Sequence, residues 1–466
     1  MKNHKILPVF NPFDRSLIQE IPMQGKEELE KALETAYRLF TDRKSWLPPH
    51  ARIDVLGKLE TLMREKAEEL TILASTEGGK PYMDSKVEIH RAINGVRIAA
   101  EEIGRLKGTQ IPMGLTASST GRLAFTMHEP IGVVAAISAF NHPLNLIVHQ
   151  VVTAFAPGCP AIVKPAGTTP MTCLRFVELM QDAGVPTGWV QALILDNEDA
   201  EILATDKRVS YLSFIGSAKV GWHLKSKLSP GTRCALEHGG AAPVFVDQDV
   251  ALEKVVPALA KGGFYHAGQV CVSVQRVFAH HSIARKLAMQ LSEAAQKLKV
   301  GNPLDPTTEV GPLILPKEAD RIHNWIQGAI EEGSELLCGG NKIGKTCYAP
   351  TVLWNPSDKS KVSQEEIFGP VVCVYSYEDL DVAIAAANAI PYHFQAAVFS
   401  RNLDTALYCV QNLQASAVMV NDHTAFRVDW MPFGGWDASG EGVGGIGYTM
   451  REMTREKLMV MKSEVF

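Results

Sequence analysis

Apolar residues recur at three- and four-residue spacing between residues 26 and 105 of the 466-residue chain. This spacing places apolar side chains on one face of a helix, so we predict successive amphipathic helices. The clearest stripes are Leu29, Leu33, Ala36 and Phe40, and Leu56, Leu59, Leu62 and Met63. The segment Glu77-Gly-Gly-Lys-Pro81 breaks the pattern, because glycine and proline end helices. The prolines within residues 6–22 predict an irregular N-terminal segment.

Short apolar runs replace the helical stripes from residue 123 onwards. Runs at 123–128 and 131–137 predict two strands, joined by a turn at Glu129-Pro130 into a hairpin. Strands predicted at 161–165, 190–195 and 211–215 alternate with helices at 169–183, 198–204 and up to residue 228. The alternation resumes after residue 240, with strands at 243–246 and 271–278 and helices at 251–263 and 283–298. Residues 457–466 are typical of a final edge strand. This order predicts an α/β fold with parallel sheets, in two domains that meet near residue 240.

Composition indicates the class of protein. The chain is 46% hydrophobic with a formal net charge of -5, and its charges are not clustered, so nothing favours nucleic acid or an anionic membrane. The longest apolar stretch, residues 131–139, is too short to cross a bilayer, and the N-terminus has no apolar run of signal-peptide length. The eight cysteines form no Cys-x-x-Cys pair, which is typical of reduced thiols. We therefore expect a cytoplasmic protein.

Cys271 is the first candidate for chemistry. It lies in Gly268-Gln-Val-Cys271, at the entrance to the β-branched run Val272-Ser-Val-Gln-Arg-Val-Phe278. A cysteine at this place can present its side chain without burying it, and its thiolate is a strong nucleophile if neighbouring groups lower its pKa. The alternative is a small buried hydrophobic side chain.

Three other residues could act with a nucleophile or a ligand. Glu237, followed by His-Gly-Gly240, could be a general base with a raised pKa, or a surface or helix-capping glutamate. Asn141 follows an apolar strand, and its amide could stabilise an oxyanion or only occupy a turn. Lys164 ends a predicted parallel strand, where α/β sheets bind ligands; a solvated lysine is the alternative.

Two glycine-containing stretches concern nucleotide binding. In Phe214-Ile-Gly216-Ser217-Ala-Lys-Val-Gly221, a strand enters a helix, and the free N–H groups near Ser217 would suit a pyrophosphate. An ordinary tight turn is the alternative. Residues 442–447 have the spacing of a dinucleotide fingerprint, but no strand precedes them, so we reject that motif. The histidines show no metal-ligand spacing, and we expect no metal site.

Taken together, these motifs resemble the aldehyde dehydrogenase superfamily, in its NAD(P)-dependent, non-CoA type. The order that carries the resemblance is Asn141, Lys164, the 216–221 turn, Glu237-His-Gly-Gly240, Gly268-Gln-Val-Cys271, Glu365-Glu-Ile-Phe-Gly-Pro370, Phe426-Arg-Val-Asp429 and Met431-Pro-Phe-Gly-Gly435. The resemblance covers essentially the whole chain. It implies two doubly wound α/β domains and a small β extension that joins subunits. The expected bounds are 1–111 and 131–239 for the coenzyme domain, 240–440 for the catalytic domain, and 112–130 and 454–466 for the extension.

The resemblance also implies a catalytic role for three residues. Cys271 matches the nucleophile and Glu237 the general base, while the Asn141 amide and the backbone N–H of Cys271 match the oxyanion hole. The implied reaction oxidises an aldehyde to the carboxylic acid through a thiohemiacetal and a thioester. The family relationship further implies a homodimer or homotetramer.

Other positions match residues that bind the coenzyme, NAD or NADP. Lys164 and Glu366 match residues that hold the two ribose hydroxyl groups, and Phe368 matches one that packs near the nicotinamide. Ser217, within the turn bounded by Gly216 and Gly221, matches the position of the pyrophosphate.

Three departures from the family pattern matter. His238 stands in place of a usual leucine. Gly167 stands where NAD-preferring members often have a glutamate, so we expect NADP to be accepted as well as NAD. Gly444 stands where many members have a second carboxylate near the active site, which puts in doubt any proton relay between two carboxylates.

Two alternatives stay open at this stage. A CoA-acylating enzyme would need Cys271 and Asn141 but would have less use for Glu237. A non-catalytic binding or structural member of the fold would need none of the three, so their joint presence argues against it. The sequence leaves open which aldehyde is oxidised and whether the oligomer is a dimer or a tetramer.

Overall fold

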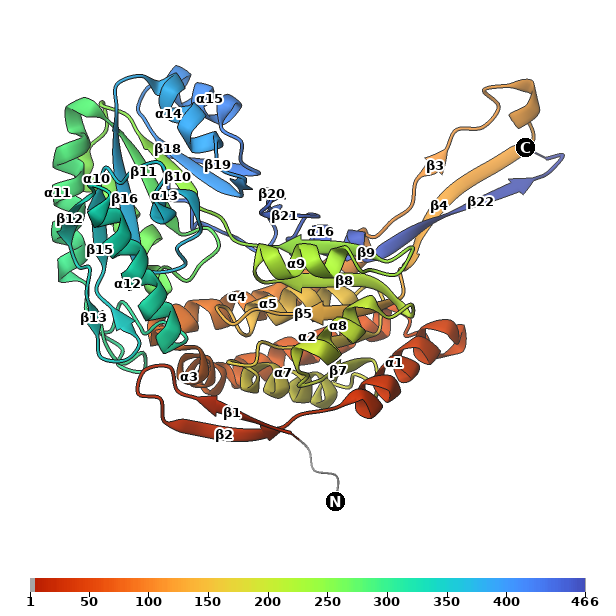
Figure 1. The fold of residues 1–466 in the computed structure, drawn as a ribbon. Coiled ribbons are helices and arrows are strands. Elements are labelled where there is room, and N and C mark those ends of the chain that lie inside the picture. The colour runs from red at the N-terminus through yellow and green to blue at the C-terminus, as the bar shows by residue number, and fades with distance from the viewer. Residues whose placement is uncertain (1–4, 466) are drawn as a thin grey trace.

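The computed structural model describes residues 5–465, which form two large sheets flanked by helices and a long projecting arm (Figure 1). The α/β fold with parallel sheets is confirmed. The helical stripes near the N-terminus are confirmed too, as α1 (Lys26–Thr41), α2 (Pro49–Glu65), α3 (Ala67–Gly78) and α4 (Tyr82–Glu102). Most of their stripe residues, such as Leu33 and Leu59, are fully buried, whereas Phe40 and Leu62 are half-buried. The expected break falls between α3 and α4, where Gly79 takes a left-handed φ of 70°.

A six-stranded sheet is formed by five strands between residues 133 and 237 and one strand near the C-terminus, with strand order β21-β9-β8-β5-β6-β7. Its strands are β5 (Val133–Ile137), β6 (Ala161–Lys164), β7 (Val190–Ala192), β8 (Val209–Ile215), β9 (Arg233–Glu237) and β21 (Gly440–Glu441). Neighbours run parallel except β21 and β9. The accompanying helices are α5 (Asn145–Ile147), α6 (Thr153–Phe155), α7 (Met171–Asp182), α8 (Asn197–Thr205), α9 (Ala218–Lys225) and α16 (Ile446–Glu452).

Helices cover both faces of this sheet, as β5 shows. Val134 and Ala136 point into one core with α2, α4 and α7, whereas Val133 and Ala135 point into another with α1 and α8. A strand buried on both faces needs apolar residues at every position, which explains why its sequence is a continuous apolar run.

A seven-stranded sheet follows, with strand order β12-β15-β16-β11-β10-β18-β19. Its strands are β10 (Ala242–Val246), β11 (Val274–His280), β12 (Glu335–Cys338), β15 (Thr351–Trp354), β16 (Val371–Tyr377), β18 (Gln395–Phe399) and β19 (Ala417–Val420). All neighbours run parallel except β12 and β15. The helices around it are α10 (Leu252–Phe264), α11 (His281–Lys297), α12 (Pro316–Glu331), α13 (Lys361–Gln364), α14 (Leu380–Asn388) and α15 (Leu403–Asn412).

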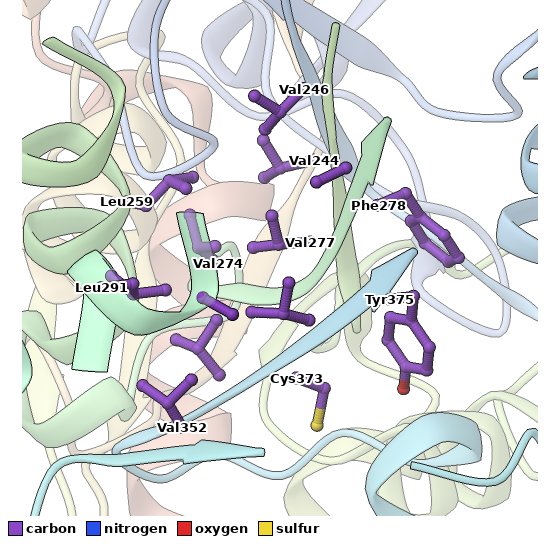
Figure 2. Close-up of a cluster of buried hydrophobic side chains, with 14 of the residues drawn as sticks. Val244, Val246, Leu259, Val274, Val277, Phe278, Leu291, Val352, Cys373 and Tyr375 are labelled. Atoms are coloured by element: carbon purple, nitrogen blue, oxygen red, sulfur yellow. The ribbon is translucent and has the colours of Figure 1, made fainter. Parts of the chain in front are cut away.

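The core of this second sheet is packed from adjacent parallel strands. Figure 2 shows side chains of β10, β11, β15 and β16 meeting those of α10 and α11. On one face Phe278 stacks on Tyr375, its register partner, with ring centroids 5.0 Å apart. Cross-strand aromatic pairs of this kind stabilise a sheet beyond the area that they bury.

The arm is a three-stranded antiparallel sheet that extends away from the body (Figure 1). It pairs β4 (Arg122–Pro130) with β22 (Thr454–Lys462) on one side and with β3 (Gln110–Ile111) on the other. The expected C-terminal edge strand is thus present, except for Phe466, which lies outside the described residues. The hairpin expected at Glu129-Pro130 is wrong: β4 continues through both residues, and β5 pairs within the six-stranded sheet.

The prediction of an irregular segment at residues 6–22 is also wrong. The segment forms an antiparallel pair, β1 (Ile6–Phe10) and β2 (Leu17–Pro22). Pro8 and Pro22 are tolerated because a two-stranded ribbon is all edge, where half of the N–H groups need no partner strand. Short pairs β13 (Lys342–Ile343) with β14 (Cys347–Tyr348) and β17 (Tyr392–His393) with β20 (Trp436–Asp437) complete the strands.

The two large sheets adjoin at the predicted site, where residues from both line one cavity. Asn141, Lys164 and Glu237 lie at or just beyond the carboxyl ends of β5, β6 and β9, in the first sheet. Cys271 and Glu366 lie just before the amino ends of β11 and β16, in the second. Loops at strand ends can present polar side chains without breaking a buried ladder, so this junction is suited to a site.

Candidate active site

One cavity of about 1080 Å³ runs along this junction, and it gathers the predicted site residues from both sheets. All of them except Gly221 line it: Asn141, Lys164, Gly167, Gly216, Ser217, Glu237, Cys271, Glu366 and Phe368. These positions span more than two hundred residues of sequence. The structure therefore brings together groups that were linked only by their order along the chain.

Cys271 is presented by a tight reversal after α10. His266, Ala267 and Gly268 have consecutive positive φ angles of 48°, 53° and 68°. At Gly268 the reversal requires glycine, because a Cβ atom there would lie 2.0 Å from the carbonyl oxygen of Gly369. The side chain of Cys271 is left partly exposed at the cavity wall.

The surroundings of Cys271 do not favour a preformed thiolate. Burial raises the pKa of the Cys271 thiol, and the negative charge of Glu237 raises it further, whereas Arg427 lowers it. The neighbours therefore do not supply the net pKa lowering that would activate the thiol. A base must take the proton before Cys271 can act as a nucleophile.

Glu237 is the carboxylate that can do so. It ends β9, and its backbone carbonyl accepts a hydrogen bond of 3.1 Å from the N–H of Gly216, in the turn after β8. Burial raises the pKa of Glu237, and the positive charge of Arg427 lowers it. Nη1 of Arg427 lies 3.9 Å from Oε1 of Glu237. A largely buried carboxyl with a raised pKa is suited to general-base work.

Asn141 is held beside the cysteine loop. Its Nδ2 donates a hydrogen bond of 3.0 Å to the backbone carbonyl of Gln269, two residues before Cys271. The following turn is anchored by Glu88, whose Oε1 accepts hydrogen bonds from the N–H groups of Leu144 and Asn145 at 2.9 and 3.0 Å. The amide is thus fixed against the loop that carries Cys271, and both residues line the same cavity, so it could act as a donor to an oxyanion there.

Lys164 and Ser217 also line the cavity. Burial lowers the pKa of Lys164, and Asp196 raises it. Ser217 precedes the first residue of α9, so unpaired N–H groups and the positive end of the helix face the cavity wall. At Gly167 the cavity has spare room, because the atom nearest to a Cβ placed there is Cδ1 of Leu7 at 3.9 Å.

Gly221 does not line the cavity and packs against His238 instead. A Cβ at this position would lie 1.9 Å from Nε2 of His238, so the helix packs directly on the imidazole. His238 is buried, its Nδ1 lies 2.9 Å from the carbonyl oxygen of Ala438, and its ring lies edge-on to Phe214 and Trp222. A direct contact of Gly221 with the coenzyme stays a prediction.

Glu366 and Phe368 close the cavity from the second sheet. Oε1 of Glu366 accepts a hydrogen bond of 3.2 Å from the N–H of Gly240, and burial raises the pKa of Glu366 to about 8. The carboxyl lies so close to Gly239 that a Cβ there would be 1.7 Å from Oε1. Phe368 has a positive φ of 48°, and its ring meets Phe140 edge-on with centroids 5.9 Å apart.

Comparison with known proteins identifies the family. The model of the "Aldehyde dehydrogenase family" matches residues 1–459. The chain belongs to the aldehyde dehydrogenase family. It is 37% identical to a 3-sulfolactaldehyde dehydrogenase of Priestia aryabhattai over 456 residues, which cover 98% of this chain and 94% of the relative. The activity is therefore the NAD(P)-dependent oxidation of an aldehyde.

Solved structures of the family show the same fold. Aldehyde dehydrogenase 21 from Physcomitrella patens, in complex with succinate, superimposes with a TM-score of 0.95 at 33% identity, covering 99% of this chain and 96% of its own. The glyceraldehyde-3-phosphate dehydrogenase GapN of Methanocaldococcus jannaschii, complexed with NADP, gives a TM-score of 0.94 at 34% identity, with 99% and 100% coverage.

The cavity suits the family's coenzyme. The helix end at Ser217, the open space at Gly167 and the buried Glu366 carboxyl, which accepts one backbone N–H, leave donors and acceptors for a dinucleotide. Among residues 5–465 no group of three or more His, Cys, Asp or Glu side chains could hold a metal ion. Across the same residues, no helix is long and apolar enough to span a bilayer.

Two features of the site concern departures from the family pattern. A Cβ at Gly444 would lie 3.8 Å from Oε2 of Glu237, so the position that lacks the second carboxylate does adjoin the predicted base. Arg427 was not among the predicted site residues, although Phe426-Arg-Val-Asp429 formed part of the resemblance. It lines the cavity beside Glu237.

Proposed function

We propose that Cys271, Glu237 and Asn141 carry out the oxidation, with Cys271 as the nucleophile. The observation that supports this most strongly is their convergence on one cavity wall from two different sheets. The three side chains are suited to different steps, since a thiol can form a covalent bond to the substrate, a buried carboxyl can transfer protons and an amide can stabilise an oxyanion.

The first half of the reaction forms the covalent intermediate. Glu237 removes the thiol proton of Cys271, and Sγ attacks the carbonyl carbon of the aldehyde. The oxygen becomes negative, and Nδ2 of Asn141 and the backbone N–H of Cys271 stabilise it. NAD(P)+, when bound, supplies the hydride acceptor that allows the thiohemiacetal to become a thioester. Lys164, Ser217, Glu366 and Phe368 would hold that coenzyme.

The second half releases the acid. Glu237 first releases the thiol proton to solvent and then accepts a proton from water, the hydroxide attacks the thioester carbonyl, and the C–S bond breaks. The thiolate of Cys271 leaves and takes this proton back from Glu237, and the product is the carboxylic acid. Because Gly444 offers no second carboxylate, Glu237 performs both proton transfers without a carboxylate partner at that position.

A CoA-acylating reaction is the second candidate, with CoA rather than water taking the acyl group. Retention of Glu237, buried beside the cysteine, favours water. Product analysis separates the two reactions. We expect free acid to form whether or not CoA is present. If no free acid forms and acyl-CoA is the product when CoA is added, the hydrolytic assignment is wrong.

Replacement of the nucleophile tests the proposal. Cys271→Ser should lower aldehyde-dependent NAD(P)H formation by about 10³-fold or more, because an alcohol is a far weaker nucleophile here than a thiolate. The variant should still fold and bind coenzyme, measured by quenching of protein fluorescence. Cys409→Ala, a buried thiol on α15, is the matched control and should keep its activity. Full activity in Cys271→Ser would exclude Cys271 as the nucleophile.

We also propose the finer properties of the protein. The substrate is a small aldehyde, as the name of the 3-sulfolactaldehyde dehydrogenase relative suggests. The coenzyme, catalytic and oligomerisation parts follow the bounds expected from the sequence, and the arm joins subunits into a homodimer or homotetramer. A cytoplasmic location is supported by the eight cysteines, all of which are free thiols; cell fractionation tests it.

A further inference from the structure

The cavity wall beside Glu237 contains a buried arginine, Arg427, whose Nε donor is not used within residues 5–465. The side chain of Arg427 is only 10% exposed. Its Nε has no hydrogen-bond partner within residues 5–465, and its Nη1 is 3.9 Å from Glu237, beyond hydrogen-bond distance. Burying a polar group costs free energy unless its hydrogen bonds are made. The geometry calls for an acceptor that the chain itself does not provide.

The guanidinium is held in one orientation by an aromatic ring. Its central carbon lies 3.5 Å from the ring centroid of Phe433, which packs in turn against Phe394 with centroids 4.7 Å apart. Stacking covers one face of the guanidinium, but its five N–H bonds lie in its plane. The donors therefore stay available at the edge of the group.

Arg91, the neighbouring arginine in the cavity wall, differs in this respect. Its Nε and Nη2 donate hydrogen bonds of 3.2 and 2.8 Å to the carboxylate of Asp429. The charge of Arg91 is thus balanced within the chain. Arg427 has no such carboxylate at hydrogen-bond distance among residues 5–465.

Gly444 adjoins Glu237 without adding a second negative charge beside it. A Cβ atom there would lie 3.8 Å from Oε2 of Glu237 and 2.7 Å from the carbonyl oxygen of Phe433, so this backbone leaves no room for a side chain. A carboxylate at this place would add to the charge of Glu237 and repel a negatively charged ligand. With Gly444, that repulsion is absent.

We propose that Arg427 binds an anionic group of the substrate, so that the aldehyde carries a carboxylate, sulfonate or phosphate near its carbonyl group. Oxyanions of this kind match the planar guanidinium by accepting two parallel hydrogen bonds. Phe433, on which Arg427 stacks, belongs to the same apolar cluster as Cys271, so a short chain separates the two ends of the substrate. This inference rests on the proposed function.

The test compares charged and neutral aldehydes of similar size. Succinic semialdehyde, 3-oxopropanesulfonate and glyceraldehyde 3-phosphate are the charged probes, and pentanal is the neutral one. The wild type should prefer at least one charged probe over pentanal by about 30-fold or more in kcat/KM, as expected for charge-assisted hydrogen bonds. Arg427→Met should reduce this preference to about threefold or less, mainly through KM.

The preference ratio isolates substrate recognition from effects on Glu237. Any change that Arg427→Met causes in the general base acts on both aldehydes, so it cancels in the ratio. Arg97→Met is the matched control, because Arg97 is an exposed arginine of α4 that pairs with Glu101; it should keep the preference. Succinate binding, measured by calorimetry, should be lost in Arg427→Met and kept in Arg97→Met.

Two results would overturn the inference. One is a wild-type enzyme that oxidises pentanal as well as every charged probe, and the other is an unchanged preference ratio in Arg427→Met. If the wild type oxidises none of the aldehydes, the proposed function fails instead. The three charged probes also show which oxyanion the site accepts.

Discussion

At the residue scale, Glu237 both affects the pKa of the proposed nucleophile and serves as its proposed base. The pKa of Cys271 is raised by burial and by Glu237, so the same carboxyl that must receive the thiol proton also makes the proton harder to lose. Proton transfer to Glu237 removes that repulsion, because the protonated carboxyl is neutral. The pair therefore favours one negative charge shared between two groups over two separate charges.

Glu237→Gln tests both proposed roles of Glu237. Because Glu237 is proposed to deprotonate both Cys271 and water, the variant should lose about 10²–10⁴-fold in steady-state turnover and should also lose the rapid burst of NAD(P)H. Stopped-flow absorbance measures both phases. A burst of one NAD(P)H per site that survives while turnover falls would show instead that Cys271 is activated without Glu237, and that Glu237 serves only the attack of water.

The same carboxyl should set the acid limb of the pH profile. Burial raises the pKa of Glu237, so the base is protonated and inactive over a higher pH range than an ordinary glutamate would be. The steady-state rate should fall as the pH decreases through this raised pKa. Arg427→Met should move the limb to still higher pH, because Arg427 lowers the pKa of Glu237.

The site residues could be predicted from the sequence only as an ordered set. Taken singly, Cys271, Glu237 and Asn141 could each have had a purely structural role. Only the family resemblance connected them as one catalytic set. Arg427 was not singled out, because an arginine 156 positions after Cys271 carries no local sign that it will be buried beside the base. Its importance depends on burial and on unmet hydrogen bonds, which are properties of the folded chain.

At the scale of elements, we propose that the turn after β6 influences which coenzyme the enzyme prefers. Gly167 lines the cavity, and a Cβ there meets nothing closer than 3.9 Å, so a glutamate can enter without a clash at its first atom. A carboxylate would repel the 2′-phosphate of NADP by like charge.

Gly167→Glu should therefore raise the KM for NADP, and the wild type should discriminate against NADP by less than about tenfold, which is roughly 1.4 kcal/mol. Initial-rate kinetics with both coenzymes measure these values. Gly167→Ala is the matched control, because it adds bulk without charge. A wild-type preference of a thousandfold for NAD would show that another group excludes the phosphate.

Regular elements were the most predictable part of the fold. Strands buried on both faces, such as β5, appear in the sequence as unbroken apolar runs, and amphipathic helices as stripes. The errors came where proline was interpreted locally. Pro8 and Pro22 lie in strands, and Pro130 ends β4 opposite Thr454, more than three hundred residues away. Strand pairing over that distance leaves no local signal.

The arm dominates the shape of the whole molecule (Figure 1). Its β22 is an edge strand, and Leu458 and Val460 on that strand are 54% and 47% exposed. Exposed apolar edges invite pairing with another chain. In a homo-oligomer the partner would cover them, which is why the arm supports the proposed dimer or tetramer.

Light scattering at micromolar concentration should therefore give the mass of a dimer or a tetramer. The double variant Leu458→Lys and Val460→Lys should shift the protein towards the monomer, because it places charge on the apolar edge. Leu407→Lys, at an exposed leucine of α15, is the matched control and should leave the mass unchanged. A fully active wild-type monomer would contradict the proposed role of the arm.

The contact between Gly221 and His238 has an evolutionary consequence. The imidazole occupies the space where any side chain at position 221 would begin, and Ala438, Phe214 and Trp222 keep it there. The two positions are therefore epistatic: whether a mutation at one is tolerated depends on the residue at the other. A lineage could gain a side chain at 221 only after it had replaced the histidine at 238, so the order of the two substitutions is constrained.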